Sequence, residues 1–495
     1  MGHGKCIGRL KMNNTQKKNS RRQFLQNTLA GVGSVALYSS GLLNLVNSTQ
    51  ALANDSDDYQ ALIYIFLDGG NDANNMLVPT GDNPLRSRYD LYRGSLALPQ
   101  NSLHALALSK PAQVYASDTH NEFGLHPNCP DMANLFNQQE LSIVCNTGNL
   151  LMPTTRQQYI DKTVNLPPQL FSHADQQKQY QSEPSNSFQY GWGGRVAELV
   201  ATKNTDDSVS PLISLSGLNA FQVSKFNEIN PFVFTETGVA DLVVSNNATE
   251  SMFEQFFNPS NDVHLMSGKY QETYNSMQLA KAVVDSAFDD ADNNGINYEQ
   301  IFAESGADNS SVGKNLQTIV KFIAGRASNQ NKRPIFFVNM RGFDTHQNLL
   351  IDHAQLMQEL NNALLALNKA LKAQGDFEKV LTFCGSEFGR TLTPNGNDET
   401  SGTDHAWGGH ALLMGGMVNG GHLFGTHPDL QVGQGLDVNN ERGRWIPTTP
   451  TCHVSALIAH WFGVEKNQLS DIFPSFNNFD DPFANNANLQ LFKEQ

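Results

Sequence analysis

PIFFVNM (residues 334–340) and KVLTFC (residues 379–384) are two short apolar stretches that predict buried β-strands. The segment between them, roughly 350–373, carries leucines at steps of three and four, which is the pattern of an amphipathic helix. These leucines are Leu356, Leu360, Leu364, Leu367 and Leu371. A strand, a helix and a second strand at this spacing predict a βαβ crossover, so both strands end at the same edge of one sheet.

Further strands are predicted at 59–67, 141–146 and 212–215, where apolar residues again run together. Together these segments indicate an α/β fold with a mostly parallel central sheet flanked by helices. The polar stretch from about 240 to 330 contains helical patterns and predicts a helical insertion or cap. The expected organisation is a leader at 1–53 followed by one large domain at 54–495.

Acidic and imidazole side chains gather just beyond the predicted strands. In open α/β sheets this edge is where ligands bind. Asp, Glu and neutral His are also the ligands that a hydrolytic divalent-metal site requires. The candidate metal ligands are Asp68, Asp344, His346, Glu387, Asp404, His405 and His410.

Each of these groups also has an ordinary structural explanation. Asp68 opens the turn Asp68-Gly69-Gly70, and adjacent Asp and His residues form hydrogen-bonded pairs in many proteins. Two such pairs, together with acids at strand ends, favour a shared metal. The acid-rich set suits zinc, manganese, magnesium or calcium better than copper or an iron–sulfur cluster.

The N-terminus has the pattern of an export signal. Arg21 and Arg22 precede a weakly apolar stretch from 28 to 46, and Ala-Leu-Ala at 51–53 is a small-x-small cleavage site. The stretch is too polar to predict a membrane helix. We therefore expect a periplasmic or secreted protein that the twin-arginine machinery exports, without a membrane span in its mature form.

The charge of the mature chain excludes some partners. Residues 1–53 hold seven Lys and Arg and no acid, so the remainder has 26 basic and 48 acidic side chains, a net charge of −22. This acidity argues against nucleic acid as a partner. The mature chain has no C-x-x-C pair, and Cys129 and Cys145 are either a disulfide or buried thiols.

Four motifs together resemble a family of exported bacterial proteins known as domain of unknown function 1501. They are IFLDGGND (65–72), GFDTH (342–346), GSEFGRT (385–391) and GTDH (402–405). The family is related to the alkaline phosphatase/sulfatase superfamily. This resemblance implies a mostly parallel α/β sheet and metal-assisted chemistry on phosphate or sulfate esters.

The resemblance also implies roles for individual residues. Asp68 matches the first-strand metal aspartate, whereas Asp344 and His346 match an Asp…His ligand pair. Ser386-Glu387 stands where relatives often have Asp-His. Because a hydroxyl and a carboxylate replace a carboxylate–imidazole pair there, the number of metals is left open at one or two. The segment 402–410, with Asp404, His405 and His410, falls where relatives place a late histidine.

The superfamily nucleophile is a Ser, Thr or modified Cys at a helix N-terminus, and Ser172 in FSHAD (171–175) is the candidate here. The same Ser-x-x-Asp pattern is also a helix capping box. Arg390 is expected either to hold an anionic ester oxygen or to form a surface ion pair. A sulfatase C-x-P-x-R motif is absent from the sequence.

These observations favour an exported metal-dependent hydrolase or transferase that acts on a small-molecule or glycan ester of phosphate or sulfate. Two alternatives remain open at this point. One is a binding or assembly protein of the cell envelope that keeps a metal without turnover. The other is a structural envelope protein in which metal only stabilises the fold.

Replacing Arg21 and Arg22 together with lysine is expected to abolish export, because the twin-arginine pattern is the proposed address. Cell fractionation and the size of the periplasmic protein measure this outcome, and cleavage near residue 53 is expected for the wild type. Unchanged periplasmic delivery of the double variant would contradict the proposed export route.

Overall fold

Strand β1 (Ala61–Asp68) lies in the middle of the central sheet, and its first seven residues are buried. It pairs in parallel with β9 (Ile335–Arg341) on one side and with β10 (Val380–Gly385) on the other. Helix α14 (Leu349–Ala373) joins β9 to β10. The predicted crossover is therefore confirmed, with β1 inserted between its two strands, and all three strands end at one edge.

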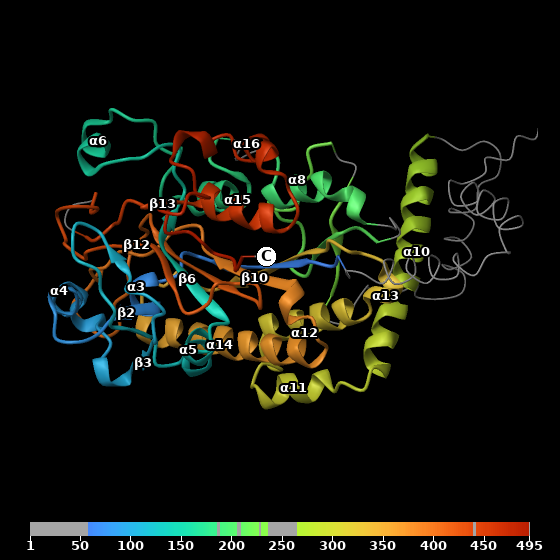
Figure 1. Ribbon diagram of the computed structural model, residues 1–495, viewed down its shortest axis with the longest axis horizontal. Coiled ribbons are helices and arrows are strands. Elements are labelled where there is room, and N and C mark those ends of the chain that lie inside the picture. Colours follow the sequence, from blue (N-terminus) through green and yellow to red (C-terminus); the bar gives the residue numbers. More distant parts are fainter. Residues whose placement is uncertain are drawn as a thin grey trace, which may run out of the picture. The chain divides into compact units, whose positions relative to one another are not determined.

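This computed structural model describes residues 58–185, 189–204, 209–226, 229–235, 265–438 and 442–494. The predicted leader, at 1–53, lies outside the described residues. The unit from Tyr59 to Gln495 has helices on both faces of its central sheet (Figure 1). The predicted α/β fold class is confirmed.

The central sheet is mixed but mostly parallel, and among the described strands only β11 runs antiparallel to its neighbours. In spatial order its strands are β4 (Gln113–Val114), β12 (Leu423–His427), β6 (Leu141–Gly148), β11 (Gly409–Met414), β10, β1, β9, β7 (Leu212–Ser214) and β8 (Phe232–Val233), with β13 (Thr449–Pro450) paired to β6. A small antiparallel sheet contains β2 (Leu77–Pro79), β5 (Phe123–Leu125) and β3 (His104–Ala105).

The helices form a layer on each face of the sheet (Figure 1). One layer contains α5 (Pro130–Asn137), α11 (Tyr298–Glu304), α12 (Ser311–Ala324) and α14, with α10 (Leu265–Asn293) and α13 (Arg326–Asn329) packed on α12. The other contains α7 (His173–Ser182), α8 (Trp192–Leu199), α15 (Thr451–Trp461) and α16 (Leu469–Ile472). The other described α-helices are α3 (Ala73–Met76), α4 (Pro84–Arg93) and α6 (Arg156–Asp161).

Alternate residues of β1 serve the two faces, because successive side chains of a strand point in opposite directions. Ile63 and Ile65 belong to the buried cluster under α14, whereas Tyr64 and Phe66 belong to the cluster under α8 and α15. Burial on both faces explains why β1 reads as a continuous apolar run.

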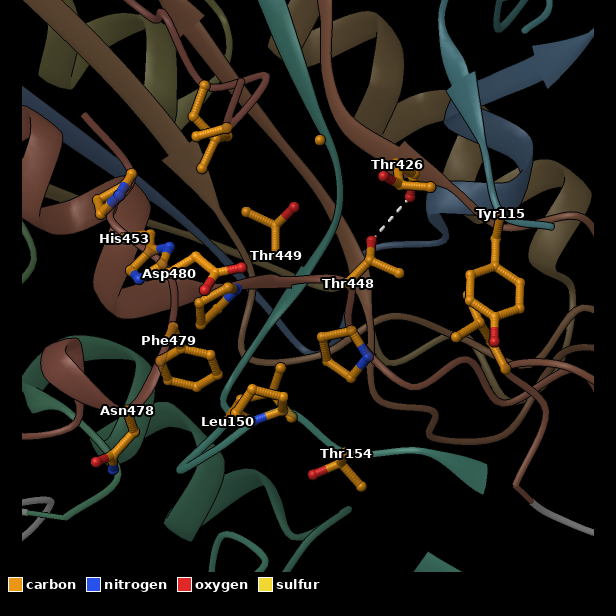
Figure 2. A pocket seen from close by; sticks show the side chains of 18 of the residues that line it. Tyr115, Leu150, Thr154, Thr426, Thr448, Thr449, His453, Asn478, Phe479 and Asp480 are labelled. Atoms are coloured by element: carbon orange, nitrogen blue, oxygen red, sulfur yellow. Dashed lines mark hydrogen bonds between the residues drawn. The ribbon is translucent and has the colours of Figure 1, made fainter. Parts of the chain in front are cut away.

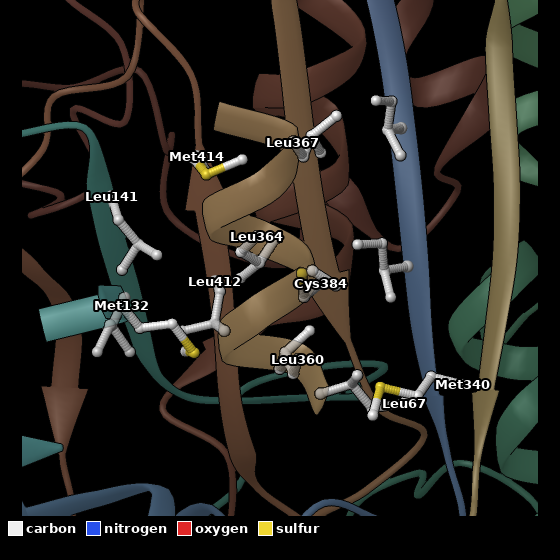
Figure 3. Close-up of a cluster of buried hydrophobic side chains, with 14 of the residues drawn as sticks. Leu67, Met132, Leu141, Met340, Leu360, Leu364, Leu367, Cys384, Leu412 and Met414 are labelled. Atoms are coloured by element: carbon white, nitrogen blue, oxygen red, sulfur yellow. The ribbon is translucent and has the colours of Figure 1, made fainter. Parts of the chain in front are cut away.

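The leucine stripe of α14 packs onto the sheet as the sequence predicts. Leu360, Leu364 and Leu367 are fully buried and share one cluster with Cys384 of β10 and Leu412 of β11 (Figure 3). Because this contact fixes the helix over the strands, it also fixes the loops at both ends of α14.

The four cysteines of the described chain are free and buried, so the thiol alternative holds for Cys129 and Cys145. Burial raises the pKa of both thiols, which keeps them protonated. No helix among the described residues is long and apolar enough to cross a membrane.

Replacing Leu364 with alanine is expected to destabilise the protein by about 2–5 kcal/mol, because it leaves a cavity between α14 and the sheet. Ile351→Ala on the same helix is the matched control, since Ile351 is 71% exposed, and it should change stability by about 0.5 kcal/mol or less. Urea denaturation of both variants measures the difference. Equal stability losses would contradict the packing described here.

Candidate metal centre

The end of β1 is held against the loop that follows β9. The Phe343 N–H donates to the Asp68 carbonyl over 3.1 Å, and Gly69 adopts a φ of +122°. A Cβ at Gly69 would lie 2.4 Å from the Asp344 nitrogen, so only glycine permits this approach. The glycine turn therefore fixes the backbone that carries Asp344.

Four side-chain atoms converge beyond these strand ends. Asp344 Oδ1 lies 3.0 Å from His346 Nε2, 3.2 Å from His405 Nε2 and 3.4 Å from His173 Nε2. His405 Nε2 is itself 3.0 Å from the Nε2 atoms of both His173 and His346. We call Asp344, His173, His346 and His405 the Asp–His cluster.

The far nitrogen of each ring faces an oxygen that can only accept a hydrogen bond. His405 Nδ1 donates to the Phe171 carbonyl over 2.8 Å, and His173 Nδ1 donates to Glu387 over 2.9 Å. His346 Nδ1 lies 3.5 Å from the Asp404 carboxylate. The two hydrogen bonds favour ring protons on Nδ1 of His405 and His173, and all three contacts orient the imidazoles, as partners behind a metal ligand do.

When the rings carry their proton on Nδ1 alone, their Nε2 atoms present lone pairs toward Asp344 and His405. Burial lowers the pKa of His405 and so favours its neutral form, whereas the hydrogen bond that His173 donates to Glu387 raises the pKa of His173. Burial opposes ionisation of Asp344, but Arg390, His173 and His346 together hold the pKa of Asp344 below its usual range. Converging lone pairs beside a carboxylate are stable only around a proton or a metal cation.

The spacing fits a divalent ion. In a tetrahedral site with metal–ligand bonds of about 2.0–2.1 Å, ligand atoms lie about 3.3 Å apart. Five contacts in the Asp–His cluster span 3.0–3.4 Å, and His173, Asp344 and His405 form its compact part, with ligand atoms all within 4.8 Å of one another. Three imidazole nitrogens and one carboxylate oxygen are also a donor set that suits zinc better than magnesium or calcium.

Two other predicted ligands lie behind this cluster. Asp404 contacts His346 and accepts a 2.7 Å hydrogen bond from Arg442. Glu387 is fully buried and accepts from His173 and from the Gly69 N–H. Both carboxylates thus hold ligand rings, and neither supplies an atom to the cluster.

Asp68 is separated from the cluster by an amide side chain. Gln177 Nε2 donates to Asp68 Oδ1 and, over 3.3 Å, to Glu387 Oε1. Asn339 donates to the other Asp68 oxygen over 2.9 Å. The amide of Gln177 thus bridges the two carboxylates, and we expect a single metal at the Asp–His cluster.

His410 lies elsewhere, which corrects its place in the predicted ligand set. It is the second residue of β11, where the strand turns its ring into the interior. Its Nδ1 accepts from the Asn146 N–H over 3.0 Å, and burial lowers its pKa to about 4. A buried strand position beside β6 explains this histidine without a metal.

Arg390 is also corrected, because its guanidinium is fully buried and does not reach solvent. It donates to Asp344 over 2.7 Å and to the carbonyls of Gly69 and Thr403. The Gly69 and Asn71 N–H groups are likewise used within the protein, on Glu387 and Ser386. Arg390 therefore orients the Asp344 carboxylate.

Ser172 precedes α7 immediately, and its side chain makes no hydrogen bond to the backbone of the helix. Its hydroxyl instead donates to Asp175 Oδ2 over 2.7 Å. The capping-box alternative is thus replaced by a serine–aspartate pair next to His173. Phe171, whose φ is +74°, turns its carbonyl toward His405 at the same place.

His173, the first residue of α7, was not among the metal ligands predicted from the sequence. It lies 171 residues before Asp344, and α7 belongs to no predicted crossover. One signal was available: His173 and Gln177 are four residues apart, so a helix brings both side chains to one face. Arg442 and Arg444 were missed as well, because they lie in a segment without a strand or helix pattern.

The protein is expected to bind one divalent metal ion per chain, and His173→Ala should lose it, because a cluster ligand disappears. Asp404→Ala should retain the site but bind metal about 10–100-fold more weakly, since Asp404 only orients His346. Elemental analysis and metal titration measure both values. Chelator should lower the melting temperature of the wild type, because the ion stabilises only the native state.

His460→Ala is the control, because His460 bonds to the Val464 carbonyl and lies outside the cluster. It should keep full metal content. If zinc, manganese and chelator all leave the melting temperature of the wild type unchanged, the proposed metal centre is wrong. Two bound ions per chain would contradict the expectation of a single metal.

Solved structures resemble the chain only distantly. The lipoteichoic acid synthase LtaP from Listeria monocytogenes is 9% identical, with 76% of this chain and 72% of that chain covered and a TM-score of 0.32. The PsFucS1 sulfatase from Pseudoalteromonas sp. is 11% identical, with 78% and 68% covered and a TM-score of 0.29. The C-terminal periplasmic domain of EcEptC from Escherichia coli, solved in complex with Zn, is 8% identical, with 73% and 74% covered and a TM-score of 0.29.

At TM-scores this low, we draw no conclusion about activity from these structures. No curated protein matches the sequence significantly. A family model described as a protein of unknown function, DUF1501, matches residues 59–440, which include every residue of the Asp–His cluster. The chain therefore belongs to the DUF1501 family.

Proposed function

We propose that this protein is an exported, metal-dependent hydrolase or transferase of a phosphate or sulfate ester. The observation that carries the proposal is the Asp–His cluster, in which Asp344 and His405 each contact both other imidazole nitrogens at 3.0–3.4 Å. Such a set has a clear chemical purpose when it holds a cation, and Asp344 is half exposed, so a substrate can reach it.

His173, Asp344, His346 and His405 are the proposed ligands, and zinc is the metal that their donor atoms favour. When bound, the ion would polarise the ester oxygen and lower the pKa of an attacking hydroxyl or water. The chain's own contribution is to hold the ligands. Phe171, Glu387 and Asp404 fix the three rings, and Arg390 fixes the carboxylate.

Ser172 is the proposed nucleophile and Asp175 the group that receives its proton. The 2.7 Å hydrogen bond between them supports this assignment, because a nucleophile needs a base within reach. Ser172 Oγ would attack the phosphorus or sulfur atom, its proton would pass to Asp175, and the ester oxygen would leave as an alkoxide that takes a proton from water. Water or a second alcohol would then release the group from the serine.

Two arginines beside the cluster support an anionic substrate. Arg442 contacts Asp404, and Arg444 lies over the Phe171 ring with its guanidinium carbon 4.1 Å from the ring centroid. The Arg444 Nε is buried and has no hydrogen-bond partner among the described residues. In an acidic protein, this local positive charge fits the non-bridging oxygens of a phosphate or sulfate group.

Ser172→Ala is expected to lose turnover by on the order of 10³-fold or more while it keeps its metal, because only the nucleophile is removed. Zinc-loaded protein would be assayed with p-nitrophenyl phosphate, bis-p-nitrophenyl phosphate and p-nitrophenyl sulfate. A burst of p-nitrophenol in the wild type, absent in the variant, would report the covalent intermediate.

Ser87→Ala is the control, because the Ser87 hydroxyl bonds only to the Asn83 carbonyl on the exposed side of α4. It should keep full activity. Full activity in Ser172→Ala would overturn the nucleophile assignment. A metal-loaded wild type that cleaves none of the three esters would overturn the enzymatic proposal.

A further inference from the structure

A cavity opens at the same edge of the sheet as the Asp–His cluster. It measures about 630 Å³, within the usual range for small-ligand sites, and lies beside Leu150, Thr426 and Thr449. Leu150 follows the carboxyl end of β6, and the other two belong to β12 and β13. Because only β11 separates β6 from β10, the cavity is about 10 Å along the edge from β10, at two strand spacings.

The cavity wall is rich in hydroxyl and amide groups and has a balanced charge. Arg156 and Asp480 are the two residues of its lining that carry a full charge. Tyr115, Thr154, Phe479 and other side chains from separate parts of the chain lie around it (Figure 2). A wall of this kind offers little to a phosphate or sulfate ion and favours a neutral polar molecule.

Some polar groups of the wall are already used within the protein. Thr448 donates to the Thr426 carbonyl over 2.9 Å and accepts from Asn146, which holds its hydroxyl in place (Figure 2). The Asn478 amide nitrogen donates to the Leu151 carbonyl over 2.8 Å. These bonds make the wall rigid before any ligand enters, which lowers the entropy lost on binding.

The groups left open include acceptors as well as donors such as the Asn477 and Asn486 amides. Within the described chain, neither the Asp480 carboxylate nor the Asn478 side-chain oxygen has a hydrogen-bond partner, and the Tyr115 hydroxyl is also open. Acceptors on the wall require donors on the ligand. A molecule with several hydroxyl groups meets this requirement without bringing charge.

His453 adds a buried acceptor beside the cavity. It is 5% exposed, its ring packs edge-on against Phe476 and Phe479, and its Nε2 has no partner among the described residues. Burial lowers the pKa of His453 to about 4, so the ring is neutral at pH 7. An unpaired buried nitrogen is destabilising, and a hydroxyl donor would relieve that cost.

The apolar part of the wall suits the same kind of molecule. Phe479 and Leu150 supply apolar surface next to the polar groups. A sugar ring presents C–H faces and hydroxyl edges together, so it can use both kinds of surface at once. A flat aromatic ligand would leave the open acceptors unpaired.

We infer that this cavity binds a neutral sugar unit of the substrate, placing an ester on a neighbouring part of the same glycan at the Asp–His cluster. The inference deepens the proposed function and rests on it for the role of the ester. It identifies the substrate class as a glycan ester, with Tyr115, Asn478 and Asp480 as the residues that recognise the sugar.

The test measures binding without turnover. Saturation-transfer NMR and calorimetry would use cellotriose, maltotriose, laminaritriose, mannotriose and N,N′,N″-triacetylchitotriose up to millimolar concentration, with and without chelator. At least one trisaccharide is expected to bind the wild type in both conditions. Tyr115→Phe and Asp480→Ala should each weaken it about fivefold to thirtyfold, since each removes a hydrogen-bonding group.

Tyr92→Phe is the matched control, because Tyr92 packs against the core away from the cavity, and it should bind as the wild type does. Failure of all five trisaccharides to bind, or binding that both cavity variants leave unchanged, would overturn the inference. Displacement of bound sugar by inorganic phosphate or sulfate would overturn it too, because the cavity would then be an anion site.

The results also separate this inference from the proposed function. Sugar binding without cleavage of any ester would overturn the enzymatic proposal and support the sugar site. Cleavage of the simple aryl esters without sugar binding would support the enzymatic proposal and overturn the sugar site.

Discussion

The parallel pairing of β1 with both β9 and β10 is the constraint on which this structure depends. It brings three strand ends to one edge, so loops that are far apart in the sequence become neighbours. The glycine turn after β1 then lets the Asp344 backbone approach, because no side chain intervenes at Gly69. The buried face of α14 holds this arrangement from one side of the sheet.

Around this edge, the protein uses its acidic residues in two ways. One carboxylate, Asp344, faces the imidazole nitrogens, whereas Glu387 and Asp404 stand behind the rings and hold them. Gln177 donates hydrogen bonds to both Asp68 and Glu387 and so links a further acidic group to this arrangement. The result favours one cation, in a place where several carboxylates alone would repel one another.

The same edge carries the polar cavity near β6, β12 and β13. Its position follows from the single antiparallel strand, β11, which leaves β6 parallel to β10 and turns its carboxyl end to the same side. Charge is concentrated at the Asp–His cluster and balanced at the cavity. This division is what a substrate with one charged group and a neutral body would require.

The sequence by itself determined the class of fold and most of the cluster. Apolar runs and a leucine stripe are local signals, so they fixed the strands, α14 and the shared edge that holds Asp344, His346 and His405. The tertiary structure decided what depends on side-chain direction. It showed that His173 belongs to the cluster and that Asp404 and Glu387 lie behind the ligand rings, with Asp68 beside them. It also showed that His410 lies in the core and that Arg390 points into the protein. Spacing along the chain shows which residues lie near an edge, but only packing between distant segments decides which atoms meet there.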